Sequence, residues 1–146
     1  MPTDVVPSSE ECNCVAVRQS ARHITQFYDQ IMARSGLRTT QFSVLAKLQR
    51  LGPLTINALA AKMVMDRTTL GRTIRPLVRQ TLVAIVRGSA DRRSKELHLT
   101  DAGLDRLREA VKEWLRAQGR FEEIFGAKRT AELRALLHVV AASELL

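Results

Sequence analysis

Apolar side chains recur every three or four positions along most of this chain, which is the spacing that lines one face of an α-helix. From about Cys12 to Arg34 the repeat consists of Val17, Ala21, Ile24, Tyr28 and Ile31. The same period predicts five more helices, at about 40–51, 56–63, 67–80, 101–125 and 127–142. The pattern therefore predicts a mainly helical protein.

Residues that favour helix ends support these boundaries. Asp66 and Thr100 have the short polar side chains that cap a helix N-terminus, and Thr39 or Thr40 is expected to cap the second helix. Ser8 and Glu11 have the spacing of a capping box for the first helix. Gly36 and the pair Gly52-Pro53 are suited to end helices.

One part of the chain has the pattern of a β-hairpin. Residues 82–87 are apolar and rich in β-branched side chains, residues 95–99 alternate, and a polar basic turn at 88–94 separates them. Leu54 and Thr55 are interpreted as a short link between helices. The order of three helices followed by a hairpin predicts a winged helix-turn-helix lobe over 39–100.

Helices lie on both sides of this lobe in the sequence. Residues 1–9 contain Pro2, Pro7 and small polar groups, and are predicted to form a flexible N-terminal tail. The apolar stripes at 10–38 and 101–146 exceed what a compact lobe needs for its core. These two segments are therefore predicted to form a helical dimerisation region.

Positive charge is concentrated in about a quarter of the chain. The formal net charge is +8, and the stretch from Lys62 to Lys95 contains nine basic residues against two acidic ones. Charge gathered in this way indicates a surface for a polyanion, although a merely soluble basic face is the alternative.

The helix predicted after Asp66 carries most of this charge on one flank. At 100° per residue, Thr68, Arg72, Arg75 and Arg79 fall within roughly 60° of arc, opposite an apolar flank. The planar fork of arginine suits both guanine edges and phosphates. We expect Thr68, Thr69 and Arg72 to reach base edges, and Arg67, Arg75 and Arg79 to contact phosphates. An ordinary surface helix with outward arginines is the alternative.

Two further features qualify this prediction. Pro76 removes a backbone donor inside the helix and is expected to kink it. Arg92 and Arg93, at the hairpin tip, are expected to enter the minor groove, with Asp91 orienting Arg93 by a charge-assisted hydrogen bond. A solvated turn is the alternative for the tip.

The segments 59–73 and 91–100 resemble the helix-turn-helix and the wing of the MarR family of bacterial regulators. The second segment, DRRSKELHLT, has the D-x-R tip and the strand ending in Leu-Thr that are typical of that wing. The resemblance covers nearly the whole chain. It implies a homodimer that binds a pseudo-palindromic DNA site, usually as a repressor that a small molecule or oxidation releases. Pro76 departs from the commonest family pattern.

Two hypotheses describe the signal. In the first, a small aromatic molecule enters a crevice between the dimer helices and the lobe. This crevice would be lined by aromatic side chains and by groups suited to an anion: Phe27, Tyr28, Phe42, Trp114, Arg18, Arg22 and His23. Packing in the core is the alternative role of the aromatic side chains.

The second hypothesis makes Cys14 a redox sensor. Its place near the start of the first helix resembles the reactive cysteine of the family's organic-hydroperoxide regulators, and Tyr28 matches one of two tyrosines that contact it there. Thr39 stands at the position of the other tyrosine. A helix N-terminus and Arg18 would favour the reactive thiolate, whereas apolar burial would oppose it.

Other classes of protein have little support in the sequence. No cofactor motif, acid–base pair or cluster of metal ligands is recognisable, so we predict neither an enzyme nor a metal site. No apolar run has the length of a membrane span and no secretory signal is present, which predicts a cytoplasmic protein. Sequence-indifferent DNA packing and a winged domain used only for protein contacts are the alternatives.

Overall fold

The computed structural model describes residues 5–146. It contains two 3-10 turns, six α-helices and three strands in this part of the chain. In order these are η1 (Ser9–Glu11), α1 (Asn13–Met32), η2 (Ala33–Ser35), α2 (Thr39–Leu51), β1 (Leu54–Thr55), α3 (Ile56–Met63), α4 (Arg67–Arg79), β2 (Val83–Arg87), β3 (Lys95–Leu99), α5 (Asp101–Phe125) and α6 (Ala127–Ala142). The predicted mainly helical winged helix-turn-helix fold is confirmed. Residues 1–4 of the predicted tail lie outside the described part.

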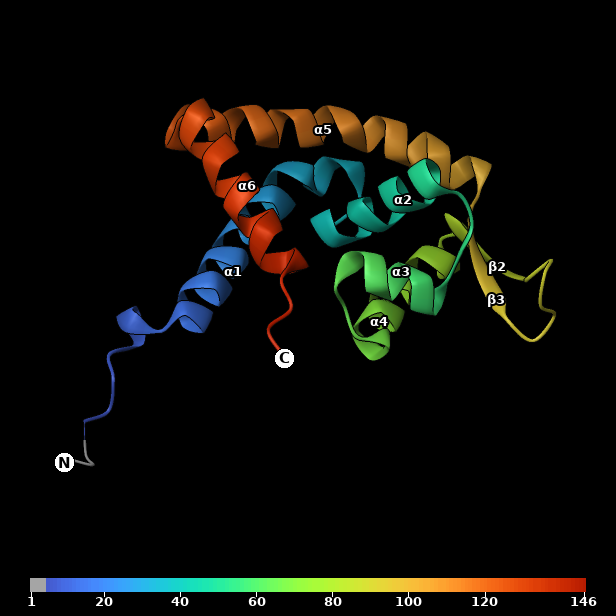
Figure 1. Cartoon of the computed structure of the whole chain (residues 1–146). Helices are drawn as coiled ribbons and strands as arrows, with labels where there is room; N and C mark the ends of the chain where they lie inside the picture. The colour runs from blue at the N-terminus through green and yellow to red at the C-terminus, as the bar shows by residue number, and fades with distance from the viewer. Residues whose placement is uncertain (1–4) are drawn as a thin grey trace.

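The long helix α5 runs along one side of the molecule (Figure 1). Near its C-terminal end lie α1 and α6, and near its N-terminal end lie α2, α3, α4 and the hairpin of β2 and β3. The hairpin projects away from the helices, so its turn is the part farthest from α1. This arrangement leaves one face of α4 and the hairpin turn uncovered.

The sheet has three antiparallel strands in the order β1-β3-β2. Leu97 of β3 is paired with Ile85 on one side and with Leu54 on the other. The interpretation of Leu54 and Thr55 as a simple link was therefore wrong, because these two residues add an edge strand to the hairpin. This strand ties the start of α3 to the base of the wing.

The core joins α2, α3, α4 and the sheet to α5 and the end of α1. Its largest fully buried side chains are Met32, Leu45, Leu59, Leu70, Leu77, Val44 and Val83. Phe42 of α2 is also buried and stacks on Trp114 of α5. The apolar flanks of α2, α3 and α4 thus meet in one core, as their periodicity predicts.

Two of the predicted N-caps are confirmed, and two are wrong. Thr100 caps α5, because its Oγ1 accepts a hydrogen bond from the backbone N–H of Gly103 at 2.9 Å; Asp66 is described below. Arg38, rather than Thr39 or Thr40, is the N-cap of α2, because the helix already begins at Thr39. The N–H of Thr39 donates to Oδ1 of Asp29. Ser8 caps the short turn η1 instead of α1.

Pro76 does not divide α4, which continues as one helix to Arg79. The C-cap residue of α4 is Gln80, and its backbone N–H donates to the carbonyl of Pro76 at 3.0 Å. The last turn that carries Arg79 is therefore closed by a backbone hydrogen bond.

Among the described residues, no helix combines the length and the apolar character that crossing a membrane requires.

Candidate nucleic-acid interface

The start of α4 is held by a double hydrogen bond between Asp66 and Thr69. Oδ1 of Asp66 accepts from the backbone N–H of Thr69 at 2.8 Å, and Oδ2 accepts from Oγ1 of Thr69 at 2.7 Å. The hydrogen bond from the backbone N–H of Thr69 has the largest effect in lowering the pKa of the Asp66 carboxyl, and the hydrogen bond from the Thr69 hydroxyl has the second largest. Asp66 is therefore ionised at neutral pH. Its negative charge also interacts favourably with the positive end of the helix dipole of α4.

The two flanks of α4 differ as the sequence predicts. Leu70, Ile74 and Leu77 are buried in the core. Every residue predicted to contact DNA is exposed, namely Arg67, Thr68, Thr69, Arg72, Arg75 and Arg79. None of the ion pairs found within residues 5–146 involves an arginine of α4. The exposed flank thus offers guanidinium and hydroxyl donors to an external acceptor.

Two surface hollows lie on either side of this exposed flank. The hollow toward α2 has a volume of about 430 Å³, and its lining consists of Arg38, Thr40, Gln41, Thr69, Arg72, Thr73 and Pro76. The hollow toward the sheet has a volume of about 340 Å³, and it is lined by Ile56, Arg67, Gly71, Ile74, Arg75, Val78, Arg79, Ile85, Lys95 and Leu97. No acidic side chain in the described part of the chain contributes to either lining. Both hollows are therefore suited to anionic groups.

Arg38, Thr40 and Lys95 were not predicted as site residues. Lys95 belongs to the basic stretch of the sequence, but its place beside α4 follows from the pairing of β3 with β1 and β2. Arg38 and Thr40 lie 29 or more positions before Thr69 in the chain, and only the packing of α2 against α4 brings them together. The periodicity of a single helix contains no signal for such contacts.

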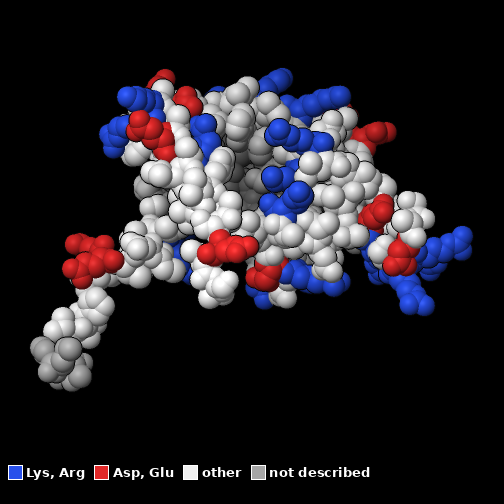
Figure 2. Space-filling view, in the orientation of Figure 1, with Lys and Arg blue, Asp and Glu red and all other residues white. Residues whose placement is uncertain are grey.

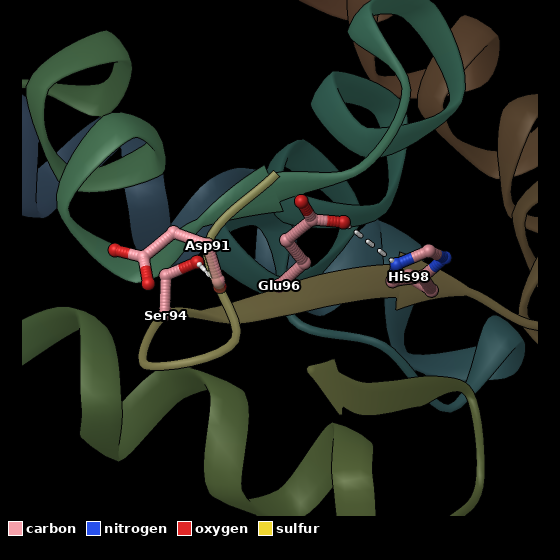
Figure 3. A network of polar contacts seen from close by, with 4 residues as sticks. All are labelled: Asp91, Ser94, Glu96 and His98. Atoms are coloured by element: carbon pink, nitrogen blue, oxygen red, sulfur yellow. Dashed lines mark hydrogen bonds and ion pairs between the residues drawn. The ribbon is translucent and has the colours of Figure 1, made fainter. Parts of the chain in front are cut away.

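The wing turn carries its two arginines outward. Arg92 and Arg93 are exposed, and Figure 2 shows Lys and Arg side chains gathered at the end of the hairpin. Within the turn, Oγ of Ser94 donates to the backbone carbonyl of Asp91 at 2.8 Å, as seen in Figure 3. The tip is thus a positively charged loop with an internally bonded backbone.

Asp91 contributes to this loop in a different way from the one expected. Its Oδ1 accepts a hydrogen bond from the backbone N–H of Arg93 at 2.9 Å. Among the described residues no ion pair joins Asp91 to a guanidinium. The expected charge-assisted bond to the Arg93 side chain is therefore replaced by a bond that shapes the turn. Glu96 and His98, also in Figure 3, pair with each other farther along β3, with 3.2 Å between Oε2 and Nε2.

The aromatic residues suggested for a ligand crevice are divided between two places. Phe42 and Trp114 pack against each other, with ring centroids 6.0 Å apart, and belong to the core. The ring contact places this pair apart from Phe27 in the single chain, and a role in a ligand crevice stays a prediction. His23 and Phe27 line a cavity of about 240 Å³ together with Ile24, Gln26, Gln30, Phe121 and Ile124.

Three other residues of the same hypothesis lie on α1. Tyr28 contacts Phe27 edge-on, and its hydroxyl donates to Oε1 of Gln118. Burial, the largest influence, raises the pKa of the Tyr28 hydroxyl. Arg18 and Arg22 are exposed on α1 and do not contribute to the lining of the cavity beside Phe27.

Both cysteines are free and exposed at the start of α1. Cys12 is the N-cap of α1 and Cys14 lies in its first turn. Tyr28 lies on the same helix, about 21 Å farther along its axis. A contact between Cys14 and Tyr28 is therefore excluded within one chain.

Comparison with known proteins gives a consistent family. The model of the MarR family matches residues 37–95. The structure of the M. tuberculosis transcriptional regulator MosR is 31% identical, with a TM-score of 0.77, over 93% of this chain and 100% of that chain. MosR in complex with DNA is 35% identical, with a TM-score of 0.73, over 90% of this chain and 96% of that one.

A more distant structure shares the fold. BpsR of Bordetella bronchiseptica, whose DNA binding is regulated by 6-hydroxynicotinic acid, is 20% identical, with a TM-score of 0.83, over 96% of this chain and 100% of that chain. The search among curated protein sequences finds no match.

Proposed function

Because this chain belongs to the MarR family of transcriptional regulators, we propose that it binds a pseudo-palindromic DNA operator as a homodimer and acts as a repressor. The observation that carries this proposal is the exposed flank of α4. It presents Thr68, Arg72, Arg75 and Arg79, while the opposite flank is fixed in the core. The complex of MosR with DNA supports nucleic acid as the ligand.

The two hollows beside α4 suggest how a duplex is positioned. A helix that lies in the major groove has one sugar-phosphate backbone on each side. The hollow beside Arg38 would receive one backbone, and the hollow beside Lys95 would receive the other. Thr68, Thr69 and Arg72 then lie toward the base edges, and Arg67, Arg75 and Arg79 contact phosphates. Arg92 and Arg93 enter the adjacent minor groove, whose negative potential attracts arginine.

Apolar surface on α1, α5 and α6 supports the homodimer. Large apolar side chains are exposed on these helices, namely Val17, Val111, Leu115, Ile124, Leu136, Leu137, Val139 and Val140. Between the same helices lies a groove of about 500 Å³ with an almost wholly apolar lining. Large exposed apolar patches are uncommon on monomers and mark interaction sites. A second copy that covers this groove would place two α4 helices about one DNA turn apart.

The test of this proposal is the selection of bound fragments from a random DNA pool, followed by affinity measurements at several salt concentrations. We expect one motif with two related half-sites and a steep fall of affinity with salt, because phosphate contacts release counterions. A sequence-indifferent packing protein would bind all fragments equally. Equal binding, or affinity that salt does not change, would refute the proposal.

Release of the DNA by a small aromatic molecule is the first candidate for regulation. The cavity beside Phe27 and Phe121 has apolar walls, and His23, Gln26 and Gln30 offer hydrogen bonds. The regulation of BpsR by 6-hydroxynicotinic acid supports a ligand of this chemistry. Screening hydroxylated aromatic acids for release of the selected DNA, with Phe27→Ala as the comparison, tests it.

Oxidation of Cys14 is the second candidate, and the exposure of both thiols at the start of α1 favours it. The measurement is DNA affinity before and after treatment with cumene hydroperoxide, in the wild type and in the Cys14→Ser and Cys12→Ser variants. Loss of affinity that Cys14→Ser abolishes supports sensing by Cys14. An unchanged wild type would refute it.

A further inference from the structure

The hydroxyl of Thr69 has its only proton engaged inside the protein. Oγ1 of Thr69 lies 2.7 Å from Oδ2 of Asp66. An ionised carboxylate has no proton and can only accept hydrogen bonds, so the threonine hydroxyl is the donor. Oγ1 therefore retains acceptor capacity alone for any external partner.

The surroundings of Asp66 maintain this polarity. The other carboxylate oxygen accepts the backbone N–H of Thr69 at 2.8 Å, so both oxygens are engaged with the same residue. These bonds keep the pKa of the Asp66 carboxyl below its usual range, and the carboxyl remains ionised at neutral pH. The hydroxyl of Thr73 is turned toward the backbone carbonyl of Thr69, at 3.4 Å, and so leaves the arrangement intact.

In the proposed complex Thr69 lies toward a base edge. Its side chain is exposed in the first turn of α4, three residues before Arg72. In the major groove the two purines differ at one position, where adenine has an amino donor and guanine a carbonyl acceptor. The pyrimidines differ likewise, because cytosine has an amino donor where thymine has a carbonyl. An obligate acceptor distinguishes the members of each pair.

We propose that Thr69 is a specificity-determining residue that accepts a hydrogen bond from an exocyclic amino group, N6 of adenine or N4 of cytosine, in the major groove. The inference rests on the proposed function and adds the chemistry of one contact to it. Asp66 is then a positioning residue that sets the direction of that hydrogen bond. Arg72 has donors only and reads the complementary chemistry, an acceptor edge, from the same helix flank.

The experiment uses the full chain and the DNA motif obtained by selection. At each position of a half-site, adenine is replaced by purine or cytosine by 2-pyrimidinone, both of which lack the amino group, and affinities are measured. For the wild type we expect a loss of about three- to tenfold at one position, the size of one neutral hydrogen bond. Which analogue causes the loss shows whether adenine or cytosine is read.

Each analogue also weakens its own base pair. Three variants separate the affinity lost in this way from the affinity lost with the hydrogen bond to Thr69. Thr69→Val removes the hydroxyl while keeping the shape, so it should bind the natural and the analogue duplex equally after correction for pairing. Thr69→Ser keeps the hydroxyl and should keep the preference. In Asp66→Asn the amide can cap the helix and donate to Oγ1, which frees the hydroxyl proton. The preference for adenine over guanine, or for cytosine over thymine, should then shrink.

The outcomes distinguish this inference from the function on which it rests. A selection without a shared motif would overturn the proposed function, and the inference with it. A clear motif in which Thr69→Val and the wild type lose equal affinity with every analogue would overturn the inference alone. The inference also fails, with the function intact, if the Thr69-dependent loss occurs only when a base acceptor is removed, as with 7-deazaguanine.

Discussion

Phe42 of α2 stacks on Trp114 of α5, with ring centroids 6.0 Å apart and ring planes inclined by 18°. Phe42 is only 8% exposed, and Trp114 packs against the core from its edge. Because α5 extends from the wing to α1 and α6, this pair connects the lobe that contains α4 to the helices proposed to dimerise.

Replacement of Phe42 by alanine should therefore lower the free energy of unfolding by about 3–5 kcal/mol, since it removes a buried ring and leaves a cavity. Chemical denaturation measures this loss. Leu51→Ala, on the same helix but at a largely exposed side chain, is the control and should cost less than about 1 kcal/mol. Similar losses in both variants would show that the ring pair contributes no more to the free energy of unfolding than an exposed side chain does.

Gly103 allows the first turn of α5 to lie against the residue that precedes β2. A Cβ added there would come within 2.1 Å of the backbone carbonyl oxygen of Leu82, which cannot move aside easily. Gly103→Ala should destabilise the fold by about 1–3 kcal/mol, although alanine is the better helix former. Gly119→Ala on the same helix meets open space and should stabilise it by up to about 1 kcal/mol. Thermal unfolding of both variants checks this, and a stabilised Gly103→Ala would contradict it.

The sequence predicts local features of this fold better than contacts between distant segments. Helix ends such as Asp66 and Thr100 depend on neighbouring residues, and their side chains form the expected caps. The strand of Leu54 and Thr55 has only two residues, too few for any periodicity, and its partner Leu97 lies far along the chain. Arg38 could not be identified as the N-cap of α2 from the sequence. The backbone N–H of Thr39, at the start of this helix, donates its hydrogen bond to Asp29 on another helix, and no local pattern indicates that contact.

The same distinction holds for the candidate site. The exposed flank of α4 follows from the helical period, so the positions of its arginines could be predicted from the sequence. The hollow that Arg38 and Thr40 share with Thr69 depends on tertiary packing. The partner of the Asp91 carboxylate could not be predicted, because the conformation of the turn decides which donor it meets. In the structure its Oδ1 accepts from the backbone N–H of Arg93.

Acid should weaken the cap of α4. The pKa of Asp66 is lower in the folded protein than its ordinary value of about 3.9. The unfolded chain therefore takes up the proton first, and the stabilisation by the ionised cap is complete above that value and is lost as the pH falls through the lower, folded one. Asp66→Asn caps without titrating, so its difference in unfolding free energy from the wild type should be constant above roughly pH 5 and should change below it. Urea denaturation across this pH range is the measurement, and parallel profiles would contradict the assignment.

Arg72 and Arg79 should contribute differently to DNA binding. Arg72→Ala should reduce discrimination between the selected motif and its single-base variants by about 1–3 kcal/mol, because a base contact is lost. Arg79→Ala, at the C-terminal end of α4, should weaken binding to all duplexes alike and reduce the salt slope by about 0.9 for a lost phosphate contact. Competition titrations at several salt concentrations separate these effects. Uniform weakening by both variants would refute the assignment of Arg72 to a base edge.

Leu136 of α6 tests the proposed dimer most directly, because its side chain is 66% exposed in the single chain. If α6 packs against a second copy, Leu136→Glu buries an unpaired charge there and should convert the protein to a monomer. Sedimentation velocity measures the change. DNA affinity should fall in parallel, because one chain can hold only one half-site and loses the advantage of two linked contacts. Gln49→Glu introduces the same charge at an exposed position of α2, outside the apolar surface, and should stay dimeric. A Leu136→Glu protein that still sediments as the wild type does would place the interface elsewhere.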